Sequence, residues 1–255
     1  MRFVNNSFGK YSLLLLLIVM IFLFGYLSRP LLLHARENLP NDNVVELSDE
    51  KAVINRLVAV DAQGNGVGAN LYTRVRPGNG LVLVNINNVL ADLNTQQSAR
   101  AAVKAAAQLA NIDPDTIDVI FTIDANAELV SGRSAGSTMA LAVASALLNA
   151  TIRDDIIMTG DISEDGTIGM VQAIPQKAQA VKQMNASLFL VPSGGSSNVV
   201  KFVREKSCGK LDGYDYCSVS YVPEKGQLSD KVGIKVVEVK TLADAASYYF
   251  GYGGK

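Results

Sequence analysis

Ser-Gly-Arg-Ser-Ala-Gly-Ser-Thr-Met, at positions 131–139, sets a serine among small residues at the expected start of an Ala-rich helix. Further along the chain, Lys177 lies near the start of another expected helix. A serine hydroxyl is a weak nucleophile until a base removes its proton. Lysine can be that base only when it is neutral, which requires a large drop from its reference pKa of about 10.4. Ser134 and Lys177 therefore suggest a serine nucleophile served by a lysine base.

The surroundings of Lys177 suit a neutral amine. Pro175 fits the first turn of a helix, so Lys177 lies near the positive end of the helix dipole, which disfavours a charged amine. Burial acts in the same direction, because it penalises the ammonium form. An apolar wall is expected from the neighbouring residues Ile174, Ala178 and Val181.

The loop around Ser134 suits acyl transfer. The first backbone N–H groups of a helix lack internal partners and can bind an oxyanion. Gly132, Ala135 and Gly136 are expected to leave space for a substrate backbone. The residues alone keep plainer interpretations open, since a serine at a helix start is commonly an N-cap and a helical lysine is commonly a solvated surface charge.

Composition narrows the function classes. His34 is the one histidine of the 255 residues, which argues against a Ser-His-Asp triad and against a multi-histidine metal centre. We expect neither a metal nor a cofactor. The net charge is −1 and no basic stripe occurs, so nucleic-acid binding is not expected. No GxxxxGK[ST] motif occurs, so the sequence contains no recognisable ATPase module.

An apolar, uncharged run covers residues 11–28. As a helix it would be about 27 Å long, close to the roughly 30 Å hydrocarbon core of a membrane. We interpret residues 1–28 as an uncleaved signal anchor, with a cleaved signal peptide as the alternative. Residues 29–50 then form a linker that leaves the membrane, and 51–255 form the main domain.

Basic residues flank the apolar run on both sides, so the positive-inside rule barely decides its orientation. Cys208 and Cys217 are expected to lie in a polar, Gly-rich loop and could close a short disulfide, with two unrelated thiols as the alternative. A disulfide persists only outside the cytosol, so this pair predicts an extracytoplasmic domain. We interpret residues 198–232 as an insertion that gates substrate or contacts another subunit, or as a plain surface excursion.

Hydrophobic periodicity and turn signals predict an α+β or α/β domain. The expected strands cover residues 53–60, 69–75, 81–86, 118–123, 156–158, 167–171, 187–191 and 233–239. One expected helix begins at residue 95 and ends before 111, and three others cover residues 134–149, 176–184 and 242–250. The strand at 156–158 is expected to form a hairpin with 167–171 around the Asp165-Gly166 turn.

The order of the motifs resembles the proteolytic domain of the Lon protease family, over residues 52–195 and more loosely over 233–250. Pro77-Gly78-Asn79-Gly80-Leu81 resembles the family's PGxGxL, and residues 132–136 resemble its G-P-S-A-G nucleophile loop. Residues 158–162 resemble M-T-G-E-I, residues 166–177 fall in register with the segment that ends in the family's lysine, and 190–192 resemble its following strand.

This resemblance implies an α+β fold related to the ribosomal-protein-S5-like arrangement. It also implies that Ser134 is the nucleophile, Lys177 the general base and Thr159 the hydroxyl that orients the lysine. The implied reaction is endoproteolysis of unfolded polypeptide, with an extended substrate lying beside the segment before the serine loop. Because the ATP-driven module of Lon is absent, the enzyme is expected to cleave only accessible or already unfolded segments, or to rely on a separate partner for unfolding. The resemblance leaves open a homo-oligomeric ring.

The sequence also departs from the family pattern. Ser131 and Arg133 stand where the family more often has aspartate and proline, and Arg133 is expected to lower the pKa of Lys177 as a nearby like charge. Asp124, Glu128 and Arg133 are candidates for lining a substrate cleft, with a solvated strand edge as the alternative for the two acids.

The combination of a membrane tether with a Lon-like domain and no ATPase resembles a class of archaeal proteases. The leading interpretation is a membrane-anchored Ser-Lys endopeptidase. The alternative is a non-catalytic Lon-like module that binds protein partners at the membrane.

Overall fold

The computed structural model describes residues 19–20, 47–86, 90–91, 93–125, 129–130, 133–211 and 214–250. Residues 45–255 form one compact unit, and residues 1–44 form a separate one. Almost all of the predicted anchor and linker lies outside the described residues. Among those that are described, no helix is both long and apolar enough to cross a membrane.

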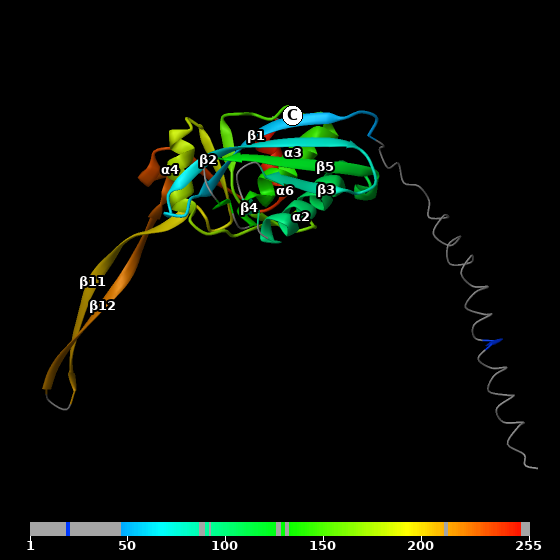
Figure 1. Cartoon of the computed structure of the whole chain (residues 1–255). Coiled ribbons are helices and arrows are strands. Elements are labelled where there is room, and N and C mark those ends of the chain that lie inside the picture. The colour runs from blue at the N-terminus through cyan, green and yellow to red at the C-terminus, as the bar shows by residue number, and fades with distance from the viewer. Residues whose placement is uncertain are drawn as a thin grey trace, which may run out of the picture. The chain divides into compact units, whose positions relative to one another are not determined.

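The first sheet contains the strands on either side of the Pro-Gly turn and the strand that precedes the serine turn in the sequence. Its strands, in spatial order, are β1 (Lys51–Val60), β2 (Gly66–Pro77), β5 (Ile117–Ala125) and β3 (Val82–Ile86). The first three are antiparallel and β3 runs parallel to β5. The helices α2 (Leu93–Ala110) and α3 (Gly136–Leu148) cover one face, and α6 (Leu242–Tyr249) packs against these two helices (Figure 1). The predicted strands and helices of this part are confirmed, with ends that shift by one to three residues.

Helix α3 is the centre of the domain. Every residue from Gly136 to Ala146 is buried, which is typical of a helix enclosed on all sides. Helix α2 packs against it through a face of small residues, of which Ala99, Ala102 and Ala106 are fully buried. Small side chains at this contact let the two helix backbones approach closely.

The Pro-Gly turn before β3 is built around one carboxylate. Asp118 accepts hydrogen bonds from the backbone N–H groups of Asn79 (2.9 Å) and Leu81 (3.0 Å). Its side chain occupies the space that a Cβ at Gly78 would need, and Gly80 has a φ of +82°. Gly78 is therefore needed because the Asp118 side chain approaches closely, and Gly80 is needed because its backbone has a left-handed conformation.

The second sheet is parallel. Its strands, in spatial order, are β13 (Lys235–Val239), β10 (Leu188–Pro192) and β7 (Ile156–Met158). The expected hairpin between 156–158 and 167–171 is wrong. Instead β9 (Ile168–Gly169) pairs with β8 (Asp161–Ile162), while β7 pairs with β10. All three residues of β7 are buried, which suits a strand inside a parallel sheet better than a hairpin arm.

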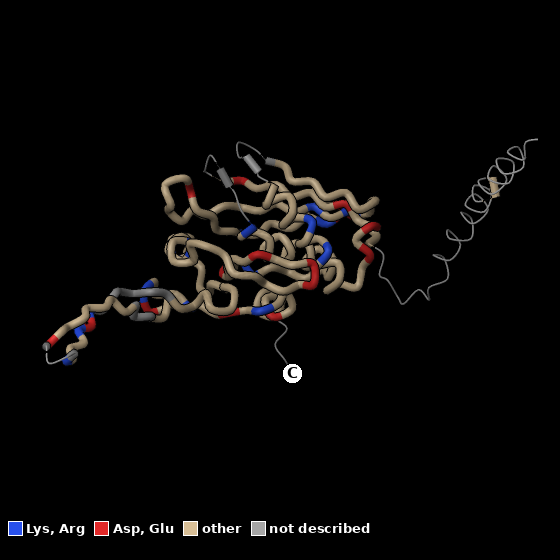
Figure 2. Tube along the Cα trace, turned by 90° about the horizontal axis from the view of Figure 1, so that it is seen from below, with Lys and Arg blue, Asp and Glu red and all other residues tan. Residues whose placement is uncertain are grey.

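The insertion is a long two-stranded ribbon. Strands β11 (Ser197–Leu211) and β12 (Tyr214–Gln227) pair antiparallel and are followed by the short helix α5 (Leu228–Val232). Figure 1 shows the ribbon extending away from the two sheets. Figure 2 shows basic and acidic residues interspersed along it and over the domain.

Cys208 and Cys217 are directly opposite each other in this ribbon and are joined by a disulfide, which confirms the predicted pairing. The expectation that they lie in a loop is wrong, because both belong to the paired strands.

Candidate active site

Ser134 lies in the short 3₁₀ turn η2 (Arg133–Ala135), between β6 (Leu129–Val130) and α3. The helix begins at Gly136, so the expectation that Ser134 itself opens it is corrected by two residues. The Ser134 carbonyl accepts hydrogen bonds from the Gly160 N–H (3.1 Å) and from Thr159 Oγ1 (3.2 Å). These two bonds tie the serine turn to the segment that follows β7.

Lys177 lies in the first turn of α4 (Ile174–Gln183), as predicted. Its backbone N–H donates to the Ala173 carbonyl at 3.0 Å, and Ala173 has a φ of +58°, which an alanine rarely adopts. The turn directs the Lys177 side chain inward, where the residue is only 3% exposed. Burial lowers the pKa of this amine from 10.5 to about 8. The predicted buried lysine is therefore present.

Thr159 connects the lysine to the serine turn. The Lys177 amine donates a hydrogen bond to Thr159 Oγ1 at 3.2 Å, and the Thr159 hydroxyl donates to the Ser134 carbonyl. Thr159 is fully buried, so this chain of bonds is shielded from water. The structure brings the three predicted catalytic residues together, although they come from η2, the segment after β7, and α4.

Gly160 and Asp161 are contributors that the sequence reasoning missed. Gly160 donates to the Ser134 carbonyl, and its own carbonyl accepts from the Ser137 N–H at 3.1 Å. A Cβ at position 160 would lie 2.5 Å from Ile168 Cγ2, so a side chain here would collide with β9. The available signal was the pair Gly160-Asp161 inside the stretch that resembles M-T-G-E-I.

Arg133 does not act on Lys177 as expected. Its Nε donates to Asp161 Oδ1 at 2.9 Å and the two residues form an ion pair. Burial alone lowers the pKa of Lys177, without a contribution from Arg133. The like-charge hypothesis is wrong because Asp161 draws the guanidinium aside and partly neutralises it.

The small residues beside Ser134 face the protein and not a substrate. Ala135 and Gly136 are buried, and a Cβ at Gly136 would clash with Ser98 Oγ and come within 2.8 Å of Ile162 Cγ2. The expectation that these two positions leave room for a substrate backbone is therefore wrong, since Gly136 makes room for close packing inside the domain. Gly132 lies outside the described residues.

Of the two acidic cleft candidates, the structure describes only Asp124. Asp124 is exposed on β5 and lines a depression of about 400 Å³ with Asn70 and Met184. Glu128 lies outside the described residues. Asp124 fits its alternative interpretation, a solvated strand edge.

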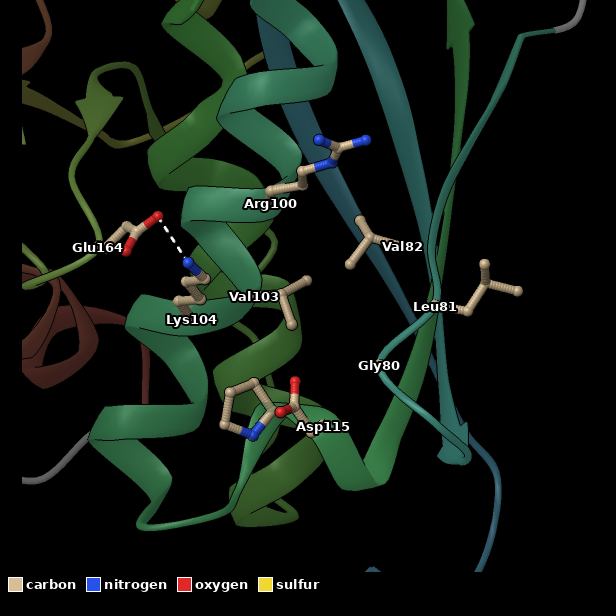
Figure 3. Close-up of a pocket in the computed structure, with 9 residues that line it drawn as sticks. Gly80, Leu81, Val82, Arg100, Val103, Lys104, Asp115 and Glu164 are labelled. Atoms are coloured by element: carbon tan, nitrogen blue, oxygen red, sulfur yellow. Dashed lines mark hydrogen bonds and ion pairs between the residues drawn. The ribbon is translucent and has the colours of Figure 1, made fainter. Parts of the chain in front are cut away.

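A larger cavity of about 530 Å³ lies between α2 and the start of β3, and Figure 3 shows Arg100 and Val82 on its two sides. Lys104 and Glu164 form an ion pair of 2.9 Å at its rim. None of Ser134, Thr159 and Lys177 lines this cavity. It is therefore separate from the serine turn.

Comparison with known proteins agrees with this geometry. The signature of the family described as Lon protease (S16) C-terminal proteolytic domain matches residues 66–212, which include all three predicted catalytic residues. Lon protease 1 of Syntrophobacter fumaroxidans is 31% identical over 162 residues, which cover 61% of this chain and 19% of the relative. Lon protease 2 of Sorangium cellulosum is 34% identical over 122 residues, which cover 46% of this chain and 15% of the relative. Lon protease of Nitratidesulfovibrio vulgaris is 30% identical over 158 residues, covering 60% and 18%.

Fold, site and comparisons define a serine peptidase domain. The chain belongs to the Lon protease family, as its C-terminal proteolytic domain. It aligns with less than a fifth of the length of the relatives named above.

Proposed function

We propose that this chain is a membrane-anchored endopeptidase that cleaves unfolded or accessible polypeptide segments without ATP. Ser134 is the nucleophile, Lys177 the general base and Thr159 the residue that orients the lysine amine. The observation that carries the proposal is the buried amine of Lys177, hydrogen-bonded to a threonine whose hydroxyl contacts the serine turn.

The reaction follows from the protonation state of the lysine. A neutral amine directs one N–H to Thr159 Oγ1 and keeps its lone pair for the Ser134 proton. As that proton moves to Lys177, the serine oxygen attacks the peptide carbonyl carbon. The ammonium then gives the proton to the leaving amine, and an acyl-enzyme ester remains. Water hydrolyses the ester with the lysine again acting as base, which regenerates both residues.

Hydrolysis of reduced, unfolded casein by the full chain without nucleotide tests this proposal. The rate should rise with pH as Lys177 loses its proton and be half-maximal near pH 8. At pH 6 about 1% of the amine is neutral, so the rate should be about a hundredfold below its plateau. A rate that is flat between pH 6 and 9 would contradict a lysine base. An absence of hydrolysis at every pH would favour the non-catalytic binding module.

The anchor, the extracytoplasmic location and the archaeal class belong to the same proposal. The apolar run at 11–28 and the disulfide between Cys208 and Cys217 support the first two.

Alkaline extraction of membranes tests the anchor. The full chain should stay in the pellet, whereas Leu15→Arg together with Leu17→Arg should release it, because each charge costs about 3 kcal/mol at the centre of a membrane helix. A membrane-impermeant maleimide should label the two cysteines only after reduction. On intact cells, labelling before reduction would contradict the disulfide, and an absence of labelling after reduction would contradict the extracytoplasmic location.

A further inference from the structure

Arg133 is a charged residue directly before the serine of the proposed mechanism. It belongs to the same 3₁₀ turn as Ser134, and its side chain is 45% exposed. A half-exposed guanidinium beside a catalytic serine can reach a bound substrate. Arg133 is thus exposed and charged, whereas Lys177 is buried and is neutral in the reactive form.

The contact with Asp161 fixes only part of the guanidinium. Arg133 Nε lies 2.9 Å from the Asp161 carboxylate, and Asp161 Oδ1 also accepts a hydrogen bond from the Ile162 N–H at 2.8 Å. Asp161 is thus held by its own strand and orients the arginine from one side. Among the described residues, neither Nη nitrogen of Arg133 has a hydrogen-bond partner. The planar edge formed by two such nitrogens matches a carboxylate in a bidentate pair.

Chain geometry limits where a carboxylate could meet this edge. Neighbouring Cα atoms are about 3.8 Å apart, so the Arg133 backbone is one residue from Ser134. An extended substrate advances about 3.3 Å per residue, and its scissile carbonyl must lie next to Ser134 Oγ. A guanidinium at the end of the Arg133 side chain therefore comes opposite a substrate residue within about two positions of the scissile bond.

We propose that Arg133 selects substrates that carry a carboxylate within two residues of the scissile bond. The inference rests on the proposed function, and it adds the chemical class of the preferred substrate. The carboxylate comes either from an Asp or Glu side chain or from the C-terminus of the substrate chain. Both sources offer the same two oxygens to the guanidinium, and the experiment separates them.

Internally quenched peptides test the preference through the ratio of kcat/KM values. One series places Glu or its neutral isostere Gln at successive positions around the scissile bond. A second series ends in a free carboxylate or an amide two residues after that bond. The full chain should favour the acidic member of one pair by about three- to thirtyfold, as expected for a half-exposed charge-assisted pair. The preference should shrink at high salt.

Variants separate selectivity from general damage. Arg133→Gln should bring the ratio close to one even if it slows every substrate, whereas Arg133→Lys should keep part of the preference. The matched control is Arg153→Gln, because Arg153 forms a similarly exposed ion pair with Asp155 at the opposite end of β7. This control should leave the ratio unchanged. A ratio that survives in Arg133→Gln would overturn the inference.

Binding provides a reading that does not depend on hydrolysis. In the full chain with Ser134→Ala, fluorescence anisotropy should show tighter binding of the preferred acidic peptide than of its neutral partner. Adding Arg133→Gln should remove that difference. Equal binding of both peptides would refute the role of Arg133. Preferential binding together with no hydrolysis by the wild-type chain would instead refute the proposed function and leave the carboxylate preference standing.

Discussion

Replacing either Ser134 or Lys177 by alanine should lower kcat/KM on a neutral peptide by about 10³- to 10⁶-fold, because each residue is useless without the other. Ser134 without a base keeps its proton, and a lysine without the serine has no nucleophile to activate. The double variant should therefore be no slower than either single variant. This non-additivity is the signature of two residues that act as one unit.

The controls for this prediction come from the same elements. Lys182 lies on the same helix as Lys177 but is exposed, so Lys182→Ala should keep nearly full activity. Thr159→Val removes the acceptor for the lysine amine and should cause a smaller loss, about ten- to hundredfold. Thr159→Ser should restore most of it, since the hydroxyl returns. If Lys177→Ala retained more than a tenth of the wild-type rate, the lysine could not be the base.

Much of the domain could be predicted because its signals are local. The Pro-Gly turn before β3 and the small-residue face of α2 show in the sequence as turn residues and as helical periodicity. The serine loop and Lys177 could also be placed next to their helices. Only the resemblance to a family predicted that Ser134, Thr159 and Lys177 belong to one site. Their spacing along the chain contains no information about which segments meet in the fold.

The misses have tertiary causes. The ribbon at 197–227 is exposed along much of its length, so it lacks the apolar alternation that identifies a half-buried strand. The strand at 156–158 is short and fully buried, and a run of three apolar residues does not reveal its partner. Arg133 differs for another reason. Its distance in sequence from Asp161 hid the ion pair that occupies its guanidinium, and Arg133 makes no contribution to the lowered pKa of Lys177.

Lys177→Met should make the fold more stable at pH 7 while abolishing the proposed activity. Methionine has a similar size and fills the buried site without a charge. A folded-state pKa of about 8, against 10.5 in the unfolded chain, corresponds to about 3 kcal/mol of unfolding free energy that the charged amine removes. The lost hydrogen bond to Thr159 offsets about 1 kcal/mol, so the net gain should be about 2 kcal/mol.

The pH dependence fixes the sign of this effect. Below about pH 8 the amine is charged in both the folded and the unfolded chain. The unfolding free energy of the wild type is then reduced by the full cost of burying this charge. Between about pH 8 and 10.5 only the unfolded chain binds the proton, so the unfolding free energy of the wild type rises with pH. The advantage of Lys177→Met should therefore be largest at pH 7, vanish near pH 10 and be reversed above about pH 10.5, where only the lost hydrogen bond of about 1 kcal/mol remains. Urea unfolding of both chains, each with Ser134→Ala to prevent self-cleavage, measures the difference in unfolding free energy. As a control, Lys182→Met should change the unfolding free energy by less than about 0.5 kcal/mol. An advantage that stays constant from pH 7 to 10.5 would mean that methionine stabilises by packing alone and that the lysine is not held uncharged in the fold.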